Sequence, residues 1–276
     1  MSVRITTLSE NTAQLGFLGE WGLSILVETE SARVLLDTGL STSAVYNADL
    51  MGIDFSTIDA IVLSHAHGDH TGGLRDVLRR VRKQVQVIAH PDIWIPKYVV
   101  YGEMSRYAGI PYMREDLESL GASFNLTKKP FKISDDIMTT GEIEMTTDYE
   151  KIDDRLCVKK SNKMIPDPLA DDLAMVVKTT EGSVLITGCA HRGIINTVRH
   201  VQKLTGGEYI HTIIGGTHLL VANQERVEKT AKELKELGLQ MLGVSHCTGF
   251  NASAALAKEF SDIFFLNNAG TQITLE

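Results

Sequence analysis

The chain has 276 residues, 43% of them hydrophobic, which is enough for a substantial core in one domain or in one domain with an insertion. The net charge is −8, and the one basic run, 79–83, reads as the solvated end of a helix, so no nucleic acid partner is expected. Three widely spaced cysteines, Cys157, Cys189 and Cys247, favour reduced thiols and a cytoplasmic location. No apolar stretch is long enough for a signal peptide or a membrane span, so no membrane partner is expected.

The first ninety residues predict strands followed by strand–helix alternation. Strand-like runs cover 3–8, 23–29, 32–37, 60–64 and 85–89, and helices are expected over 43–51 and 74–81. The second helix is expected because Leu74, Val77, Leu78 and Val81 recur at helical spacing.

Residues 91–168 interrupt this pattern and hold all six prolines of the chain. They are expected to form an insertion with a short hairpin over 131–145 and a long loop, which in a compact domain is usually functional or mobile. The run 94–112 is rich in aromatic residues, so the insertion is a candidate lid over a substrate.

Order is expected to return from residue 173. Strands over 173–179 and 183–187 flank a hairpin signal at Glu181-Gly182, and strands over 210–214, 240–244 and 263–266 alternate with helices over 193–204, 224–237 and up to Phe260. Asn223 and Asn251 are the expected N-caps of the last two helices. Two strand groups, each followed by strand–helix alternation, predict an α/β fold of two mixed sheets packed face to face with helices outside.

The most informative motif follows the strand-like run 60–64. It reads His65-Ala66-His67-Gly68-Asp69-His70. Alternate side chains of a strand share a face, so His65 and His67 can point together, and Asp69 and His70 fall in the next turn. This pattern indicates two adjacent metal ions, because imidazole and carboxylate are the usual ligands of zinc and similar ions.

The segment 64–74 resembles the His-x-His-x-Asp-His signature of the metallo-β-lactamase superfamily, and 34–39 resembles its strand ending in Asp-Thr-Gly. The fragments 21–24, 47–48, 187–196, 215–219 and 246–249 resemble a narrower branch, labelled 7,8-dihydropterin-6-yl-methyl-4-(β-D-ribofuranosyl)aminobenzene-5′-phosphate synthase. The resemblance covers nearly the whole chain, with 91–165 the least diagnostic part. It implies an αβ/βα sandwich with metal ions at one edge between the sheets.

The chain departs from the superfamily pattern at two ligand positions. No histidine lies between His90 and His191, and the strand 184–188 ends in Cys189 where the superfamily usually has a bridging aspartate. We expect His191 to supply the missing histidine. Cys189 is expected near the bridging position, as a thiolate ligand or a close neighbour, although a small buried core residue is the alternative. His246 matches the C-terminal histidine that closes the second site.

Five further residues are candidates for supporting roles. Asp37 is expected to orient a ligand imidazole through its other nitrogen, and His90 has either that role or a structural one. His218 can bind substrate or donate a proton, and a purely structural role for this histidine fits the sequence equally well. Trp21 can stack on a flat substrate ring, and Asp172 can contact substrate or lie in a solvated turn.

Three functions fit these residues, with Asp69 and His218 as the expected catalytic side chains. The first is a hydrolase with two divalent metal ions, whose bridging hydroxide attacks an ester, amide or phosphoester. The second, implied by the branch resemblance, is a transferase that joins a dihydropterin pyrophosphate to an aminobenzene ribosyl phosphate. The third is a non-catalytic metal or redox sensor. Zinc is the default ion, and manganese or iron accept the same ligands. The expected partner is a small molecule, of pterin or phosphate-bearing type, and the apolar insertion favours a homodimer.

Overall fold

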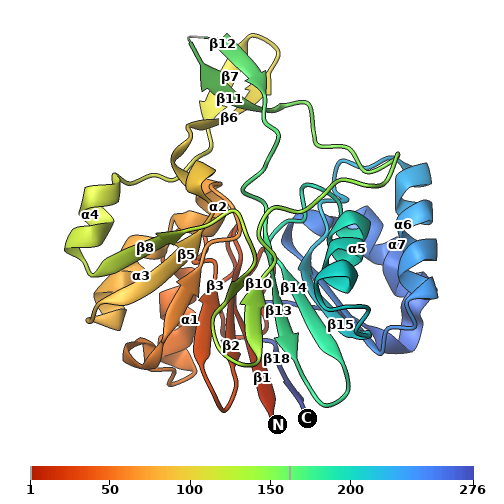
Figure 1. Cartoon of the computed structure of the whole chain (residues 1–276), viewed down its shortest axis with the longest axis horizontal. Coiled ribbons are helices and arrows are strands. Elements are labelled where there is room, and N and C mark those ends of the chain that lie inside the picture. Colours follow the sequence, from red (N-terminus) through yellow and green to blue (C-terminus); the bar gives the residue numbers. More distant parts are fainter. Residues whose placement is uncertain (1, 162) are drawn as a thin grey trace.

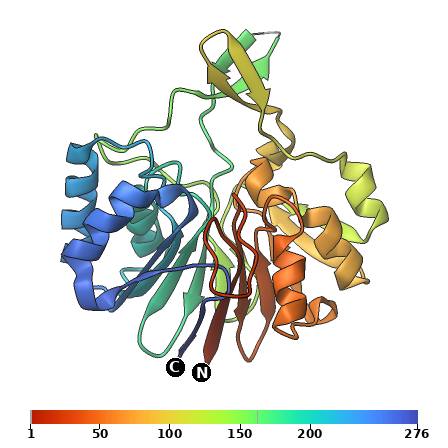
Figure 2. The same cartoon turned by 180° about the vertical axis from the view of Figure 1, so that it is seen from behind.

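The structure is a computed structural model that describes residues 2–161 and 163–276. Two seven-stranded mixed sheets lie face to face, and helices cover the outer face of each sheet (Figure 1). The architecture is therefore the α/β class and the αβ/βα sandwich that the sequence predicts. Both termini lie at one end of the sandwich (Figures 1 and 2).

The first sheet has the strand order β18-β1-β2-β3-β4-β5-β8. Its strands are β1 (Val3–Ser9), β2 (Ser24–Glu28), β3 (Arg33–Leu36), β4 (Ala60–Val62), β5 (Val85–Ala89), β8 (Ala122–Leu126) and β18 (Gln272–Leu275). The strands β3, β4, β5 and β8 run parallel, so their carboxyl ends reach one edge. The strand β18 pairs antiparallel with β1, a closure of the sheet that sequence analysis did not find.

The second sheet has the order β17-β16-β15-β14-β13-β10-β9. Its strands are β9 (Phe131–Lys132), β10 (Ile137–Thr139), β13 (Ala174–Lys178), β14 (Ser183–Thr187), β15 (Ile210–Gly216), β16 (Met241–Ser245) and β17 (Phe264–Leu266). The predicted hairpin at Glu181-Gly182 is confirmed by the antiparallel pair β13–β14. The strands β14 to β17 then run parallel and end on the same edge of the sheet.

Strand alternation divides the buried side chains among the layers. In β3, Val34 and Leu36 belong to the core between the sheets, whereas Leu35 packs in the core under the N-terminal helices. In β14, Val184 and Ile186 face the other sheet, and Leu185 faces the C-terminal helices. Both faces of each central strand are therefore apolar, as expected for a parallel sheet covered on both sides.

Helices pack on the outer faces in chain order. On the first sheet these are α1 (Ser43–Leu50), α3 (Leu74–Val81) and α4 (Arg114–Ser119); on the second they are α5 (Ile194–Leu204), α6 (Gln224–Glu236) and α7 (Phe250–Phe260). The short helix α2 (Gly68–Thr71) and the 3₁₀ turns η1 (Phe55–Thr57), η2 (Pro91–Trp94), η3 (His246–Thr248) and η4 (Ser261–Ile263) complete the set of described helical segments.

One of the two predicted helix caps is present. Asn223 Oδ1 accepts a hydrogen bond from Arg226 N at 2.9 Å and caps α6. The cap predicted at Asn251 is wrong, because α7 already begins at Phe250, behind Gly249. Gly249 has a φ of 74°, which lies in the left-handed region that favours glycine, and the helix begins directly after it.

The stretch 91–168 contains more regular structure than the expected hairpin and long loop. Its strands β8, β9 and β10 extend the two large sheets. The other four, β6 (Lys97–Tyr101), β7 (Met104–Tyr107), β11 (Leu156–Lys160) and β12 (Lys163–Pro166), form a separate sheet in the order β12-β11-β6-β7. This small sheet stands beyond the end of the sandwich opposite the termini (Figures 1 and 2).

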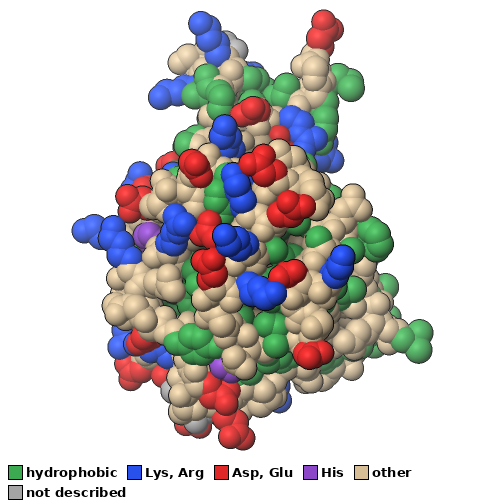
Figure 3. All heavy atoms as spheres, turned by 90° about the vertical axis from the view of Figure 1, so that its right-hand side faces the viewer, with side chains coloured by type: hydrophobic (Ala, Val, Ile, Leu, Met, Phe, Trp, Pro, Cys, Tyr) green, Lys and Arg blue, Asp and Glu red, His purple; other side chains and the backbone are tan. Residues whose placement is uncertain are grey.

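The surface over the C-terminal helices carries acidic and basic side chains side by side (Figure 3). Arg199 pairs with Glu233 and Lys235 with Glu259, each across two helices, and Lys229 pairs with Glu225 within α6. Such mixed charge is typical of a solvated surface. Within the described ranges, no helix combines the length and apolar character needed to cross a membrane.

A buried ion cluster fastens the small sheet to the sandwich. Lys97, at the start of β6, is 2% exposed, and its Nζ lies 2.7 Å from Asp171 Oδ1 and 2.9 Å from Asp167 Oδ2. The second oxygen of Asp171 accepts a hydrogen bond from Ala66 N at 2.9 Å. The cluster therefore connects the base of the small sheet directly to the backbone between His65 and His67.

We predict that Lys97→Ala lowers the free energy of unfolding by about 3–5 kcal/mol, because it leaves two buried carboxylates without their cation. Urea unfolding of the variant checks this value. Lys159→Ala, an exposed lysine of the same small sheet, is the control and should change stability by less than about 0.5 kcal/mol. Equal losses in the two variants would show that the buried pairs contribute nothing.

Candidate metal centre

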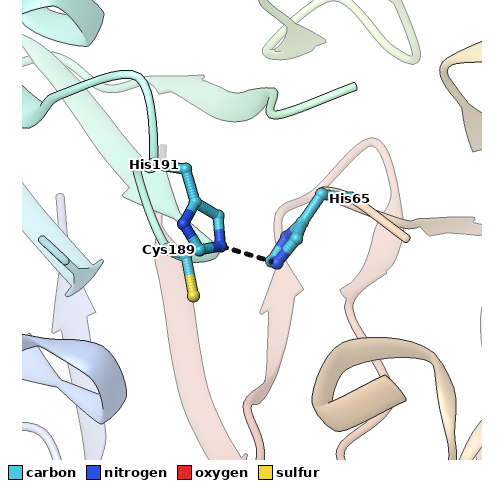
Figure 4. A group of neighbouring side chains, drawn as sticks. All are labelled: His65, Cys189 and His191. Atoms are coloured by element: carbon cyan, nitrogen blue, oxygen red, sulfur yellow. Dashed lines mark hydrogen bonds between the residues drawn. The ribbon is translucent and has the colours of Figure 1, made fainter. Parts of the chain in front are cut away.

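The sandwich brings several polar side chains to one edge, where the parallel strands of both sheets end. Asp37 follows β3, and the histidine motif follows β4 in the first sheet. In the second sheet Cys189 and His191 follow β14, His218 follows β15 and His246 follows β16. His65 and His191 face one another across the seam between the sheets, with the Cys189 thiol beside them (Figure 4).

Three imidazole nitrogens converge in a first group. His65 Nε2 lies 2.9 Å from His67 Nδ1 and 3.2 Å from His191 Nε2, and His67 Nδ1 lies 3.1 Å from His191 Nε2. All three side chains are buried. Each nitrogen pair is spaced as two ligands of one small ion are, since tetrahedral ligands about 2.0 Å from zinc lie about 3.3 Å apart.

A second group converges beside the first. His70 Nε2 lies 3.2 Å from His246 Nε2 and 3.2 Å from Cys189 Sγ. His246 Nε2 lies 3.3 Å from Asp69 Oδ2. The structure thus brings together all seven residues that the sequence nominates as ligands, His191 and Cys189 included.

Cys189 lies between the two groups. Its Sγ is within 4.8 Å of the ligand atoms of His65 and His191, and equally of those of His70 and His246. A third set, Cys189 with His218 and Cys247, meets the same limit. Cys189 is therefore placed as a shared neighbour of both groups, which is where a bridging ligand would stand.

In His65, His70 and His246, a hydrogen bond to the ring nitrogen that points away from the centre determines which nitrogen carries the proton. Asp37 Oδ2 accepts from Ser64 Oγ at 2.6 Å, so Ser64 Oγ must accept from His65 Nδ1 at 2.9 Å. Asp37 Oδ2 also accepts from His70 Nδ1 at 2.7 Å. When these two rings are neutral, the Nε2 atoms of His65 and His70 therefore present their lone pairs to the centre; for His70, whose pKa Asp37 raises, a metal ion at Nε2 would displace a proton.

His246 is fixed in the same way from a different loop. Its Nδ1 donates to Asn11 Oδ1 at 2.9 Å, because the Asn11 amide group itself donates to His246 O at 3.2 Å. The backbone N–H of His246 donates to the buried Glu10 carboxylate at 2.6 Å. These bonds turn the Nε2 lone pair of His246 toward the second group.

Burial keeps the first group neutral. It lowers the pKa of His67 to about 4 and holds the pKa values of His65 and His191 well below the usual range, with repulsion between the rings adding to the effect. Burial also opposes a charge on His70, but the Asp37 carboxylate outweighs it and raises the pKa of His70 to about 9. Neutral imidazole is the form that binds metal, so the first group is already prepared for a cation.

The carboxylate and thiol of the centre respond differently to burial. Burial raises the pKa of Asp69, but contacts with His246, His70 and His67 outweigh it and lower the pKa below its usual value. Burial and the neighbouring Cys247 raise the pKa of the Cys189 thiol well above its usual value. Asp69 is thus anionic, whereas Cys189 becomes a thiolate only if a cation stabilises it.

The backbone at this edge is held in an unusual conformation. Asp37, Ala190, His218 and His246 have left-handed φ values of 58°, 54°, 48° and 53°. A non-glycine residue rarely adopts this conformation, and such residues concentrate at functional sites. Each of these turns bends the chain at a strand end, and so directs the side chains that follow β3, β14, β15 and β16 into the seam.

Close backbone packing also requires glycine next to the motif. A Cβ on Gly188 would lie 2.1 Å from Ser64 Oγ, and one on Gly73 would lie 2.0 Å from Thr38 O. The Gly72-Gly73 pair therefore gives room for the turn after the motif. Gly188 gives room for the serine that orients His65.

The remaining predicted site residues are placed as follows. Trp21 Nε1 donates to Asp69 Oδ2 at 3.0 Å, and its ring lies 5.3 Å from that of His246. The His218 ring lies against that of His191, tilted by 54° with 4.1 Å between ring centroids, and neither of its nitrogens has a hydrogen-bond partner among the described residues. Asp172 is buried, which raises its pKa to about 7, and it accepts from Arg192 N at 2.9 Å.

His90 is the predicted site residue that the structure keeps away from the centre. Its Nε2 pairs with Glu142 at 2.8 Å and its Nδ1 accepts from Asp92 N at 3.0 Å, so it caps η2. Of the two roles expected for His90, the orientation of a ligand imidazole is therefore wrong, and the structural role is the one that the structure shows. Sequence analysis gave no role to Ser64 or Asn11, because only the fold brings them behind the ligand rings.

The centre lies at the base of a cavity of about 650 Å³. Its floor includes His67, Asp69, Cys189, His191 and His246. Its walls come from the loops around Trp21 and Leu220 and from the underside of the small sheet. A small molecule in this cavity would contact the candidate ligands directly.

These donors fit divalent metal ions on structural grounds. Three lone-pair nitrogens in mutual contact cannot all be satisfied by hydrogen bonds to each other, since each neutral imidazole has one donor. A cation between them removes that conflict. Zinc, iron and manganese all accept such imidazole and carboxylate donors, and a thiolate favours the softer zinc or iron.

Comparisons with known proteins agree with this geometry. The family model of the metallo-beta-lactamase superfamily matches residues 22–237. A protein of Methanocaldococcus jannaschii named 7,8-dihydropterin-6-methyl-4-(beta-D-ribofuranosyl)-aminobenzene-5′-phosphate synthase is 33% identical, over 98% of this chain and 95% of its own. The crystal structure of Tm1679, described as a metal-dependent hydrolase of the beta-lactamase superfamily, superposes with a TM-score of 0.85 at 30% identity and covers 98% of both chains. The Bacillus subtilis protein YhfI, at 13% identity and a TM-score of 0.57, shares the fold.

Proposed function

Because the chain belongs to the metallo-β-lactamase superfamily, we propose that it is an enzyme that binds two divalent metal ions and hydrolyses an ester, amide or phosphoester of a small molecule. One observation carries this proposal. Two groups of lone-pair donors, separated only by Cys189, lie at the base of a cavity large enough for a small molecule.

The proposal assigns His65, His67 and His191 to the first ion. Asp69, His70 and His246 would hold the second. Cys189, whose thiol lies near both groups, would serve as a thiolate ligand. Zinc is the ion that these donors suit best, with iron the next candidate because it also accepts sulfur.

When bound, two such ions supply Lewis acidity, which activates water as a nucleophile and stabilises negative charge on substrate oxygens. The chain's own residues supply the geometry. The Asp37 carboxylate holds His70 directly and His65 through Ser64, and Asn11 holds His246, so each of these three rings is fixed in an orientation that directs Nε2 to the centre.

Two residues above the floor complete the site. His218 lines the cavity with an unpartnered ring beside His191, and this position suits transfer of a proton to the leaving group. Trp21 fixes Asp69 through its indole N–H and presents its ring, 49% exposed, to the cavity, where a flat substrate can stack.

We predict that the protein purified without added metal holds about two ions per chain, and that His191→Ala lowers this to about one. Elemental analysis of the two proteins measures the content, and hydrolysis of neutral esters and phosphodiesters should fall with it in parallel. His211→Ala is the control, because His211 lies at the opposite end of β15 and pairs with Glu181. Full metal content in His191→Ala would contradict the assignment, and a metal-poor wild type would contradict the hydrolase.

A second function has its own support in the synthase name of the Methanocaldococcus jannaschii relative. A transferase would use the same cluster to assist departure of pyrophosphate from a dihydropterin, with an aminobenzene ribosyl phosphate as the nucleophile. Product analysis with both compounds separates the two enzymes. The hydrolase proposal predicts water-derived products alone, whereas a condensed product with released pyrophosphate would establish the transferase. Metal binding without either activity would favour the metal or redox sensor.

A further inference from the structure

We propose that Arg106, on the small sheet above the candidate metal centre, binds an anionic group of the substrate. The ligand class is then a small aromatic molecule with two charged or polar ends. One end reaches the metal centre, and the other, a phosphate or a carboxylate, reaches Arg106. The inference rests on the proposed function for the end that reacts, and it adds the recognition of the opposite end.

The small sheet presents one face to the cavity. In the pairing of β6 with its neighbours, Val99 stands opposite Arg106 on one side and opposite Leu156 on the other. All three residues line the cavity that has the candidate metal ligands at its base. Arg106 is therefore held on a hydrogen-bonded strand that forms the wall facing the metal centre.

Arg106 differs from the other arginine of this wall in being free to bind. Arg155 is already engaged, since it makes a paired contact with the Asp153 carboxylate at 2.6–3.1 Å and lies over the Tyr101 ring at 5.8 Å. The Arg106 guanidinium makes no hydrogen bond, ion pair or aromatic contact to another described residue, although the backbone of Arg106 lies in the β6–β7 pairing. An exposed arginine is ordinary on a surface, but here it faces into the cavity next to apolar Val99 and Leu156.

The charge of the cavity favours an anion. The acidic residues in its lining are Asp69 and Asp153. Asp69 belongs to the metal centre and Asp153 is neutralised by Arg155. Arg106 is thus the cation of the lining that has no acidic partner among the described residues, and with the metal ions of the proposed function bound the lining carries an excess of positive charge. An excess of charge of one sign concentrates ligands of the opposite sign.

The space between the two ends is apolar. Trp21 and Leu40 contribute from one side of the cavity, and Leu220 and Val221 from the other; all four are 44–51% exposed. Tyr101 adds a half-exposed ring from the small sheet. Exposed apolar groups gathered around one cavity indicate a ligand with an aromatic or apolar body.

The test compares ligands with one and with two anionic ends on the metal-loaded protein, by isothermal titration calorimetry. Benzoate has one anionic end. Benzene-1,4-dicarboxylate and 4-carboxyphenyl phosphate add a second carboxylate or a phosphate. We expect wild type to bind the two-ended ligands about tenfold or more tightly than benzoate, as a charge-assisted hydrogen bond allows. The ratio between these two ligands shows whether carboxylate or phosphate is preferred.

Arg106→Ala should abolish this preference and leave metal content and benzoate binding unchanged. Arg106→Lys should retain part of it, because the charge remains without the fork of donors. Lys159→Ala removes a charge from the same sheet at a residue that does not line the cavity, and it should have no effect. A preference that survives in Arg106→Ala overturns the proposal.

Ligand binding is measured without turnover, so the anion site at Arg106 and the hydrolase activity are tested independently of each other. If the preference depends on Arg106 but no ester or phosphoester is cleaved, the hydrolase is wrong and the anion site stands. If esters are cleaved and Arg106→Ala binds all three ligands as wild type does, the hydrolase stands and the anion site is wrong.

Discussion

The buried Asp37 carboxylate is the constraint on which the centre depends. Its two oxygens accept hydrogen bonds from the Ser64 backbone N–H, the Ser64 hydroxyl and His70 Nδ1, and the same hydroxyl oxygen accepts a hydrogen bond from His65 Nδ1. One side chain at the end of β3 therefore orients one ring of each ligand group. Asp37 is fully buried and its backbone has a left-handed φ, a conformation that costs a non-glycine residue free energy and that the surrounding fold maintains.

The two sheets make this arrangement possible because they end at a common edge. The first sheet delivers the histidine motif already oriented, and the second delivers Cys189, His191 and His246 from separate turns. Neither sheet alone forms a complete ligand group, since His191 belongs to one sheet and the two histidines it meets belong to the other. Both ligand groups can therefore form only when the two sheets are packed against each other.

In the proposed metal-loaded centre, Cys189 would stand where a carboxylate bridge is usual. Burial raises the pKa of its thiol, so the residue would become a charged ligand only beside a cation. A thiolate between the groups would also favour soft ions over hard ones. The neighbouring Cys247 and His218 lie close enough to Cys189 to influence that choice.

The features that sequence analysis predicted are those written in local patterns. The histidine motif, the helical spacing of Leu74, Val77, Leu78 and Val81, and the hairpin at Glu181-Gly182 each involve residues a few positions apart. The position of His191 beside His65 and His67 could also be predicted, because His191 lies two residues after Cys189 at the end of a strand and no histidine lies between His90 and His191.

The features it missed depend on contacts between distant segments. The strand β18 pairs with β1 across the full length of the chain, and Asn11 meets His246 only in the folded sandwich. The small sheet was not predicted because its short strands, such as β7 and β12, are exposed and lack a buried apolar face. His90 follows a strand and precedes a proline, a position that fits both a ligand-supporting and a structural residue, and its hydrogen bonds go to Glu142 and Asp92.

The paired metal centre is tested most directly by the position of metal ions in crystals of the loaded protein, measured by anomalous scattering at the zinc edge. We predict two peaks on either side of Cys189 Sγ, one among His65, His67 and His191 and the other among Asp69, His70 and His246. A single peak, or a peak held by Cys189, His218 and Cys247, would contradict the paired centre from which the proposed hydrolysis follows.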